Sequence, residues 1–310
     1  QTRIGGNKFV QLARNRRDRR GAGGGQEEQG AMSRQAEGRA RFAALILRPE
    51  EEIDLAEAAL LIAGEEYPDL DVAAYLSLLA HMGAEARRRV GGSRPAASAL
   101  ETLNHYLFEE LGFAGDTENY YDPRNSYLND VLDRRTGIPI SLSTVYMTVA
   151  RHSGLPIRGV GFPGHFLVKF AGEGEEIVLD PFNRGAILTE ADCQRLLDQA
   201  TAGRARFSRE LLGATVTKAI LARMLGNLKG IYAATRQYAK ALACVERILL
   251  LIPDAGPEIR DRGLLLAQMQ RTEEAVLVLT RYLKQSPAPE DSAQVKEQLR
   301  TLRMRQALLN

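Results

Sequence analysis

The 310-residue sequence is short of several residue types on which familiar protein classes depend. Its two cysteines, Cys193 and Cys244, are too few for a disulfide framework or a four-ligand zinc site. Of its four histidines, His81, His105 and His152 have no metal-ligand spacing to one another. No apolar run approaches the roughly 18 residues of a membrane span. We therefore expect no metal, no cofactor and no membrane insertion.

Net charge is also low, +2, and it is unevenly distributed. Residues 1–31 carry seven basic and three acidic residues, so the remainder of the chain has a slight negative surplus. A slightly acidic folded part lacks the basic footprint of a nucleic-acid-binding protein. Nothing resembles a signal peptide, so a reducing cytoplasm is the expected location.

The first 41 residues are predicted to be a disordered basic tail. Residues 1–31 are rich in Arg, Gly and Gln, contain the glycine run 21–25 and have almost no apolar periodicity. The first methionine is Met32, so one interpretation is a translation that begins upstream of the true start. The alternative is a genuine tail, either plain or a basic arm that touches nucleic acid or an anionic surface.

The residue pattern of the rest of the chain changes twice. Helical spacing of apolar residues begins near Phe42, and Gly112 predicts the end of this first region. Pro139 suits the first turn of a further helix, about Ile140–His152, because its missing N–H is harmless there. We expect an α+β protein with three folded regions: helical residues 42–112, a mixed core at 113–210 and a helical region at 211–310.

Three strands are predicted in the mixed core, at Ile157–Gly161, His165–Phe170 and Glu176–Leu179. Alternation along the middle strand places Leu167 and Lys169 with His165 on one face. The other face receives Phe166, Val168 and Phe170. We expect a small antiparallel sheet next to a central helix.

The C-terminal region contains an internal repeat. Ala241 and Ala275 are 34 residues apart, and so are Pro253 and Pro287. This spacing resembles tetratricopeptide repeats, in which a small residue lets two helices approach and a proline closes the unit. Two repeats and a last helix are too few to be stable alone, so we expect them to pack on the preceding domain.

The residues that could carry chemistry follow a recognisable order. A helix N-terminus at 137–141 comes first, then His165 at the start of a strand, then Asp180 at the end of another. This order resembles the transglutaminase-like, papain-related core, where a Cys at a helix N-terminus works with a His and an Asp. In such a core the helix end lowers the thiol pKa, the His accepts the proton and the Asp fixes the imidazole tautomer.

The sequence departs from that pattern at the nucleophile. No Cys lies near residues 137–143, and the position that we align with it is occupied by Pro139, or by Ile138 if the alignment slips by one residue. Ser141 is the nearest hydroxyl and Ser143 the next. Cys193 and Cys244 follow the aspartate in the chain and sit in helical patterns, where buried inert thiols are expected.

Four phrases carry a narrower resemblance. They are 125–132 (NSYLNDVL), 137–142 (GIPISL), 161–167 (GFPGHFL) and 180–183 (DPFN). Together with the repeats they resemble the SirB-type bacterial proteins, over about residues 42–290. The resemblance implies a transglutaminase-like domain followed by tetratricopeptide repeats, and it implies the activity poorly, because members are mostly named by resemblance or as regulators.

Two functions remain open. One is a non-catalytic regulatory module that binds a protein or peptide through a cleft or through the repeats. The other is a hydrolase or acyltransferase that uses Ser141, His165 and Asp180. Each candidate also has a structural interpretation: a first-turn Ser that caps its helix, a buried His and an Asp that caps a turn. We expect Asn125, Pro139, Ser143 and Gly164 to line the cleft, although Asn125 could simply form its own turn.

Overall fold

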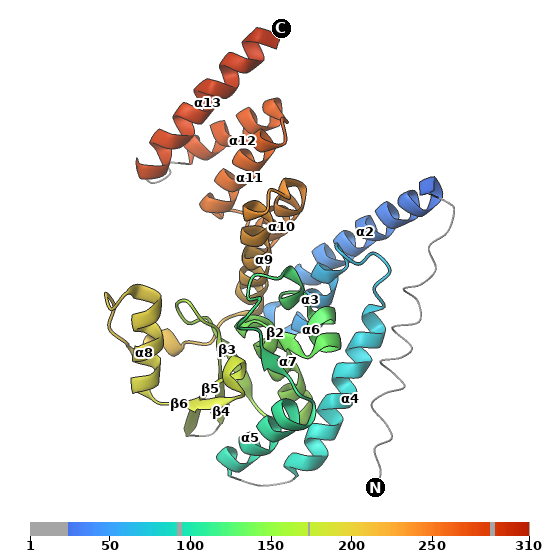
Figure 1. Ribbon diagram of the computed structural model, residues 1–310, viewed down its shortest axis with the longest axis vertical. Helices are drawn as coiled ribbons and strands as arrows, with labels where there is room; N and C mark the ends of the chain where they lie inside the picture. The colour runs from blue at the N-terminus through green and yellow to red at the C-terminus, as the bar shows by residue number, and fades with distance from the viewer. Residues whose placement is uncertain (1–23, 92–94, 173, 286–288, 310) are drawn as a thin grey trace.

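The computed structural model describes residues 24–91, 95–172, 174–285 and 289–309. Helices dominate it: α2 Gly24–Ile46, α3 Leu55–Ala63, α4 Val72–Val90, α5 Ala96–Asn104, α6 Leu128–Arg134, α7 Pro139–Ser153, α8 Glu190–Thr201, α9 Thr217–Ala234, α10 Tyr238–Leu251, α11 Gly256–Gln268, α12 Thr272–Lys284 and α13 Pro289–Leu309. The strands are short: β1 Ala114–Gly115, β2 Thr136–Gly137, β3 Ile157–Val160, β4 Leu167–Gly172, β5 Glu175–Asp180 and β6 Ala186–Leu188. The sheet and α7 lie in the lower part of Figure 1, and α9 to α13 rise above them. None of the helices within the described ranges combines the length and apolar character of a membrane span.

Local signals in the sequence set several of these boundaries. Asp54 and Asp71 accept backbone N–H groups at the starts of α3 and α4, as N-cap residues do. Pro139 opens α7, and Gly154, with a φ of 87°, ends it in the left-handed conformation that glycine adopts freely. The central helix is therefore fixed at both ends by its own sequence.

The four-stranded sheet is antiparallel, in the order β3-β4-β5-β6. Its two faces belong to different apolar clusters, as the alternation predicted. Phe166, Val168 and Phe170 join the main core, which includes α7, whereas Leu167 joins a smaller cluster with Leu197 of α8. The sheet is thus covered on both faces, which explains why β4 is apolar on both sides.

Two strand predictions need correction. His165 does not lie on a strand, because β4 begins at Leu167. The backbone N–H of His165 donates to the Phe162 carbonyl (3.1 Å), which closes a tight turn ahead of the strand and holds the histidine outside the ladder. The fourth strand, β6, was also missed, since three residues are too few to show a period of two.

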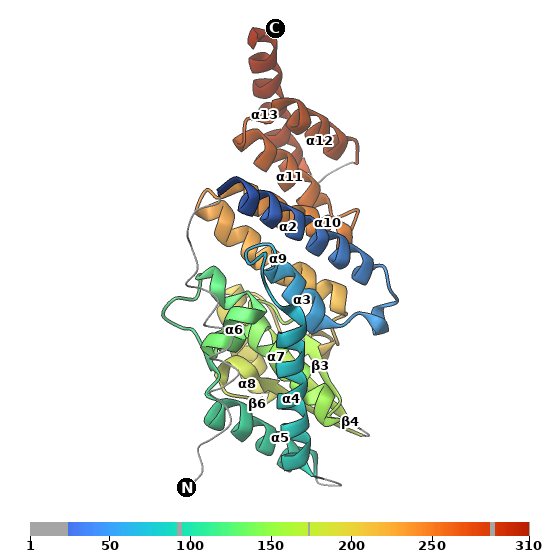
Figure 2. The same ribbon diagram turned by 90° about the vertical axis from the view of Figure 1, so that its right-hand side faces the viewer.

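The predicted tail also needs correction. Residues 24–41 are helical, as part of α2, and residues 1–23 lie outside the described residues. The Gln35 amide donates to the Glu65 carbonyl (2.8 Å), and Phe42 at the end of the helix is fully buried. Figure 2 shows α2 beside α10, so long-range packing provides the stability that the polar sequence of this helix lacks.

The C-terminal region consists of antiparallel helix pairs, α9 with α10 and α11 with α12, followed by α13. Ala241 and Ala275, which mark the 34-residue period, are fully buried. At Gly263 a Cβ atom would lie 2.4 Å from the Leu279 side chain, so only glycine permits this approach of α11 to α12. Helix α9 packs on α3 and α7, and one apolar core runs from the N-terminal helices into the repeats, which confirms the expected docking.

Candidate functional site

The N-terminus of α7 is where a nucleophile was sought. Pro139 and Ile140 form the first turn, and both side chains are buried. The Ser141 hydroxyl accepts the Ile138 N–H (3.0 Å) and lies 2.6 Å from the Asn125 carbonyl, to which it donates its proton. The hydroxyl is also 3.1 Å from the Ile138 carbonyl. Ser141 therefore ties the start of α7 to the loop before α6.

His165 and Asp180 form a hydrogen-bonded pair, with 2.9 Å between Nε2 and the carboxylate. Asp180 is 1% exposed and also accepts the backbone N–H groups of Phe182 and Asn183. The Asn183 side-chain amide donates a further bond of 2.7 Å to the same carboxylate oxygen as His165. Because a carboxylate oxygen accepts hydrogen bonds, this contact orients the imidazole with its proton on Nε2.

The remaining ring nitrogen of His165, Nδ1, makes no hydrogen bond to any residue that the structure describes. In the Nε2–H tautomer this nitrogen is a proton acceptor. The His165 side chain is 14% exposed, so a ligand from solvent can reach it. The pair is thus oriented by the fold through Nε2, and a small part of the imidazole is accessible to solvent.

The turn that carries His165 is held from two sides. Gly164 adopts a φ of 67°, and a Cβ there would lie 2.6 Å from that of Ala200 on α8, so the position requires glycine. From α9, the Arg223 guanidinium donates to the carbonyls of Phe162 (3.1 Å) and His165 (2.5 Å). An arginine of α9, close to the start of the repeats, therefore holds the turn that carries His165.

Aromatic side chains surround the pair. The Phe182 ring lies edge-on to His165, with centroids 6.0 Å apart, and it packs where a Cβ of Gly115 would be. Tyr120 contacts Phe182 in turn, and Tyr121 contacts Tyr120. Tyr121 is 78% exposed, so the cluster runs from the buried pair to a solvent-exposed aromatic surface. We call His165, Asp180, Phe182, Tyr120 and Tyr121 the His165 site.

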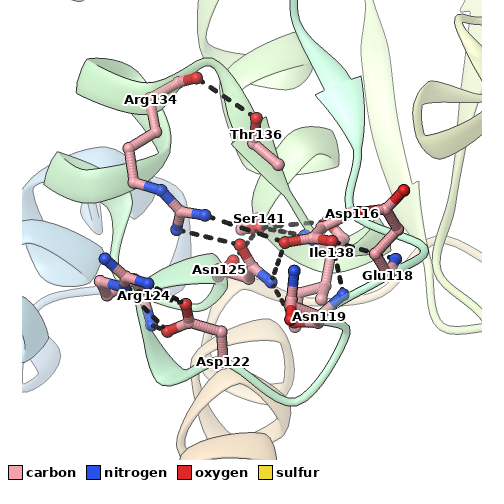
Figure 3. Close-up of polar contacts among 10 residues, drawn as sticks. All are labelled: Asp116, Glu118, Asn119, Asp122, Arg124, Asn125, Arg134, Thr136, Ile138 and Ser141. Atoms are coloured by element: carbon pink, nitrogen blue, oxygen red, sulfur yellow. Dashed lines mark hydrogen bonds and ion pairs between the residues drawn. The ribbon is translucent and has the colours of Figure 1, made fainter.

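A second polar cluster holds the loop that carries these tyrosines (Figure 3). Its centre is Asn125, which is fully buried. The Asn125 amide donates to Asp116 (3.0 Å) and to the Asn119 carbonyl (2.8 Å), and its oxygen accepts from Arg134 of α6 (3.1 Å). We call these residues, with Ser141, the Asn125 network.

The three residues of the expected triad thus fall into two clusters. His165 and Asp180 are in contact, whereas the described hydrogen bonds of Ser141 go to Asn125 and Ile138. Ser143 is fully buried and has one long contact, 3.5 Å to the Phe166 carbonyl. The arrangement provides an oriented proton acceptor, and it places the nearest serine in a helix-capping role.

Both thiols of the chain lie elsewhere. Cys193 is buried on α8 and Cys244 on α10. Burial raises the pKa of the Cys193 thiol above its ordinary value and raises the pKa of Cys244 to about 12. Both groups therefore stay protonated near neutral pH, and a protonated thiol is a poor nucleophile.

No group of three or more His, Cys, Asp or Glu side chains within the described ranges is placed to hold a metal ion. Sequence reasoning missed Arg223, because it comes 58 residues after its hydrogen-bond partner and lies on a helix of another region. It also missed Tyr120, which contacts both Phe182 and Tyr121. Asn183 lies in the motif that ends the last predicted strand, three residues after Asp180. This spacing was the sequence signal that its side chain can reach the Asp180 carboxylate.

Comparison with known proteins shows similarity along most of the chain. The model of the transglutaminase-like superfamily matches residues 73–226, and a tetratricopeptide-repeat model matches residues 228–300. A UPF0162 protein of Xylella fastidiosa is 38% identical over 253 residues, which cover 81% of this chain and 90% of that protein. A UPF0162 protein of Vibrio cholerae is 30% identical over 251 residues, 81% of this chain and 93% of that protein.

A shorter similarity extends to animals. F-box only protein 21 of Mus musculus is 39% identical over 141 residues, which are 43% of this chain and 21% of that protein. No solved structure matches the chain. The bacterial relatives align with four-fifths of this chain, and the chain therefore belongs to the UPF0162 (SirB-type) family, with a transglutaminase-like domain followed by tetratricopeptide repeats.

Proposed function

We propose that this protein is a regulatory protein-binding module whose His165 site contacts a polypeptide partner without cysteine catalysis. The observation that carries the proposal is the start of α7, where the Ser141 hydroxyl is bonded to backbone groups and not to His165. Without a nucleophile in contact with it, the imidazole serves as a hydrogen-bond acceptor for a bound segment.

The surroundings of the pair support a binding role. Tyr121 and Tyr120 are exposed beside the partly buried Phe182, and aromatic side chains of this kind are enriched where proteins meet. Arg223 connects the histidine turn to α9, the helix that leads into the tetratricopeptide repeats. Tetratricopeptide repeats, which the chain contains, support a protein partner as well.

The test uses the full chain in two assays. The first measures release of 4-nitrophenolate from 4-nitrophenyl acetate and transfer of a dansylated amine to casein, for wild type, His165→Ala and Ser141→Ala. The second places a photo-crosslinking benzoylphenylalanine at Tyr121, with Leu47, 85% exposed on the loop after α2, as the matched control position. We expect no turnover that depends on His165, and a crosslinked polypeptide from position 121 that position 47 does not yield.

Turnover that falls more than tenfold in both His165→Ala and Ser141→Ala would contradict the proposal. It would favour the alternative, a hydrolase or acyltransferase that uses Ser141, His165 and Asp180, for which the intact His165–Asp180 hydrogen bond is the supporting observation. Thermal unfolding of each variant separates a lost activity from a lost fold.

A further inference from the structure

A groove lies at the far end of the repeats from the sheet, between α12 and α13 (Figure 1). It has a volume of about 580 Å³, and none of its lining residues belongs to the His165 site. We call it the C-terminal groove. It is formed by two successive helices of a stack, which is the kind of place where a further helix can pack.

The floor of the groove is apolar. Leu283 of α12 is partly buried there, and Leu299, Met304 and Ala307 line it from α13. Met304 is 53% exposed, which is unusual for a large apolar side chain in a packed helix pair. Leu277, one helical turn before Thr280 of the lining, is 73% exposed and continues the apolar surface along α12.

Helix α13 has one apolar, buried side and a neighbouring side on which basic residues alternate with Met304 and Ala307. Val295, Leu299 and Leu302 are buried against the stack. Lys296, Arg300, Arg303, Met304 and Ala307 follow one another at helical spacing on the neighbouring side and line the groove. From 296 to 307 this second side is about 16 Å long at the helical rise of 1.5 Å per residue. That length matches about three turns of a bound helix.

The rims of the groove carry charge of one sign. Lys284, Lys296, Arg300 and Arg303 line it, and no acidic residue does. Lys284, Lys296 and Arg300 form no ion pair with a described carboxylate, and Arg303 contacts the Thr280 hydroxyl. Other cations of the repeats are neutralised within the fold, as Lys229 is by Glu258 and Asp261. The groove therefore attracts negative charge.

We propose that the C-terminal groove binds an amphipathic, acidic helix of a partner protein. Apolar side chains of that helix, four or three residues apart, would rest on Leu299 and Met304. Its Asp and Glu side chains would face Arg300 and Lys296 on the rim. The inference rests on the proposed role in protein binding, and it assigns a second surface and the chemistry of its partner.

The shape and composition of the groove favour a helix over other polyanions. Binding of single-stranded nucleic acid relies on aromatic side chains on which bases stack, and no aromatic residue lines the groove. Binding to an anionic membrane relies on apolar side chains that project outward, whereas these line a hollow between two helices. An amphipathic helix presents an apolar stripe to the apolar floor and acidic side chains to the basic rim.

The test measures binding of a fluorescein-labelled 14-residue peptide to the full chain by fluorescence polarisation. The peptide carries Leu at positions 4, 8 and 11 and mainly Glu elsewhere, and a scrambled peptide of the same composition breaks the apolar stripe. We expect the patterned peptide to bind at least tenfold more tightly than the scrambled one. Lys296→Glu with Arg300→Glu should weaken binding at least tenfold, and a peptide with Lys in place of Glu should bind this variant instead.

Two controls make the result specific. Arg305→Glu reverses an exposed charge on the same helix outside the groove, so it should change the affinity less than threefold. Tyr121→Ala alters the His165 site and should leave peptide affinity unchanged, so failure of one site is distinguishable from failure of the other. Met304→Asp, at an exposed position, should weaken binding without loss of the fold.

Three outcomes would overturn the proposal. One is equal binding of the patterned and scrambled peptides. Another is the same loss of binding free energy per reversed charge for Arg305→Glu and for the groove variant, which would mean that only overall charge matters. The third is tighter, Arg300-dependent binding of a single-stranded oligonucleotide, or of vesicles that contain phosphatidylserine, which would assign the groove to a nucleic acid or to a membrane.

Discussion

The Asn125 network and the His165 site each contain a buried carboxylate held by several hydrogen-bond donors, but only the site keeps a ring nitrogen without a partner among the described residues. In the network, Asn125 is fully buried and its amide meets a carboxylate, a carbonyl and a guanidinium. In the site, Asp180 is equally saturated, yet the imidazole it holds keeps one ring nitrogen without a partner among the described residues. The network is complete without a ligand, and the site is not.

The difference explains the position of Ser141. Its hydroxyl belongs to the network, where it joins α7 to the segment that leads into α6. A buried hydroxyl that both donates and accepts stabilises the fold, whereas a nucleophile needs its proton directed at a base. Within these two clusters, the hydroxyl of Ser141 is bonded to structural partners, whereas Nδ1 of His165 keeps an acceptor without a partner among the described residues.

The largest expected effect comes from the centre of the network. Asn125→Ala leaves the Asn119 carbonyl, the Asp116 carboxylate and the Arg134 guanidinium without their shared partner. Asp116 keeps its backbone donors and its ion pair with Arg134, so one or two groups lose their partner. At about 1–3 kcal/mol for each of them, we expect a loss of roughly 2–5 kcal/mol in the free energy of unfolding. Urea denaturation measures this loss.

Asn119→Ala is the matched control for that variant, because Asn119 is exposed and only its backbone enters the network. It should cost less than about 0.5 kcal/mol. Equal losses for the two variants would show that the loop is held by its backbone alone and that Asn125 is not its centre.

A smaller effect is expected from Ser141→Ala, which removes a capping hydroxyl from α7. We expect a loss of about 1–2 kcal/mol in the free energy of unfolding. The ring nitrogen chemical shifts of His165 should not change, because the serine and the imidazole share no hydrogen bond among the described contacts. Urea denaturation and nitrogen-15 spectra of the two proteins measure these quantities.

Ser143→Ala provides the comparison on the same helix. Its hydroxyl has one long contact, so its removal should cost less than removal of the Ser141 hydroxyl. A shift of the His165 resonances in Ser141→Ala without a loss of stability would reverse the assignment and place Ser141 in the His165 site.

Much of the fold follows from local sequence. Pro139 and Gly154 bound α7, the alternation from Phe166 to Phe170 gives the two faces of β4, and the 34-residue spacing gives the repeats. These signals act within a few residues or repeat with a fixed period, so one sequence suffices to detect them.

The rest depends on contacts between distant residues. Nothing near Arg223 indicates that it binds the carbonyl of His165, and nothing in residues 24–41 indicates that α2 packs beside α10. The chain order suggested that His165 and Asp180 meet, but it could not decide between a capping and a catalytic Ser141. That choice depends on the Asn125 carbonyl, 16 residues earlier.

The smallest expected effect concerns pH and Asp116. The Asn119 backbone N–H, together with the Asn125 amide and the Glu118 backbone, holds the pKa of Asp116 below its ordinary value of 3.8. As the pH falls through that value, the unfolded chain takes up a proton before the folded one does. The stabilisation from Asp116 is therefore complete above the ordinary pKa, and it is lost as the pH falls through the lower folded value.

Asp116→Asn removes this titration. The difference in unfolding free energy between wild type and Asp116→Asn should be constant near neutral pH and should shrink as the pH falls below about 4. Glu118→Gln changes an exposed carboxylate of the same loop and controls for net charge. A difference that stays constant down to about pH 2 would contradict this prediction. It would mean that the Asn125 network is equally stable around a neutral Asp116. The charge of Asp116 would then add nothing to the geometry that separates Ser141 from His165.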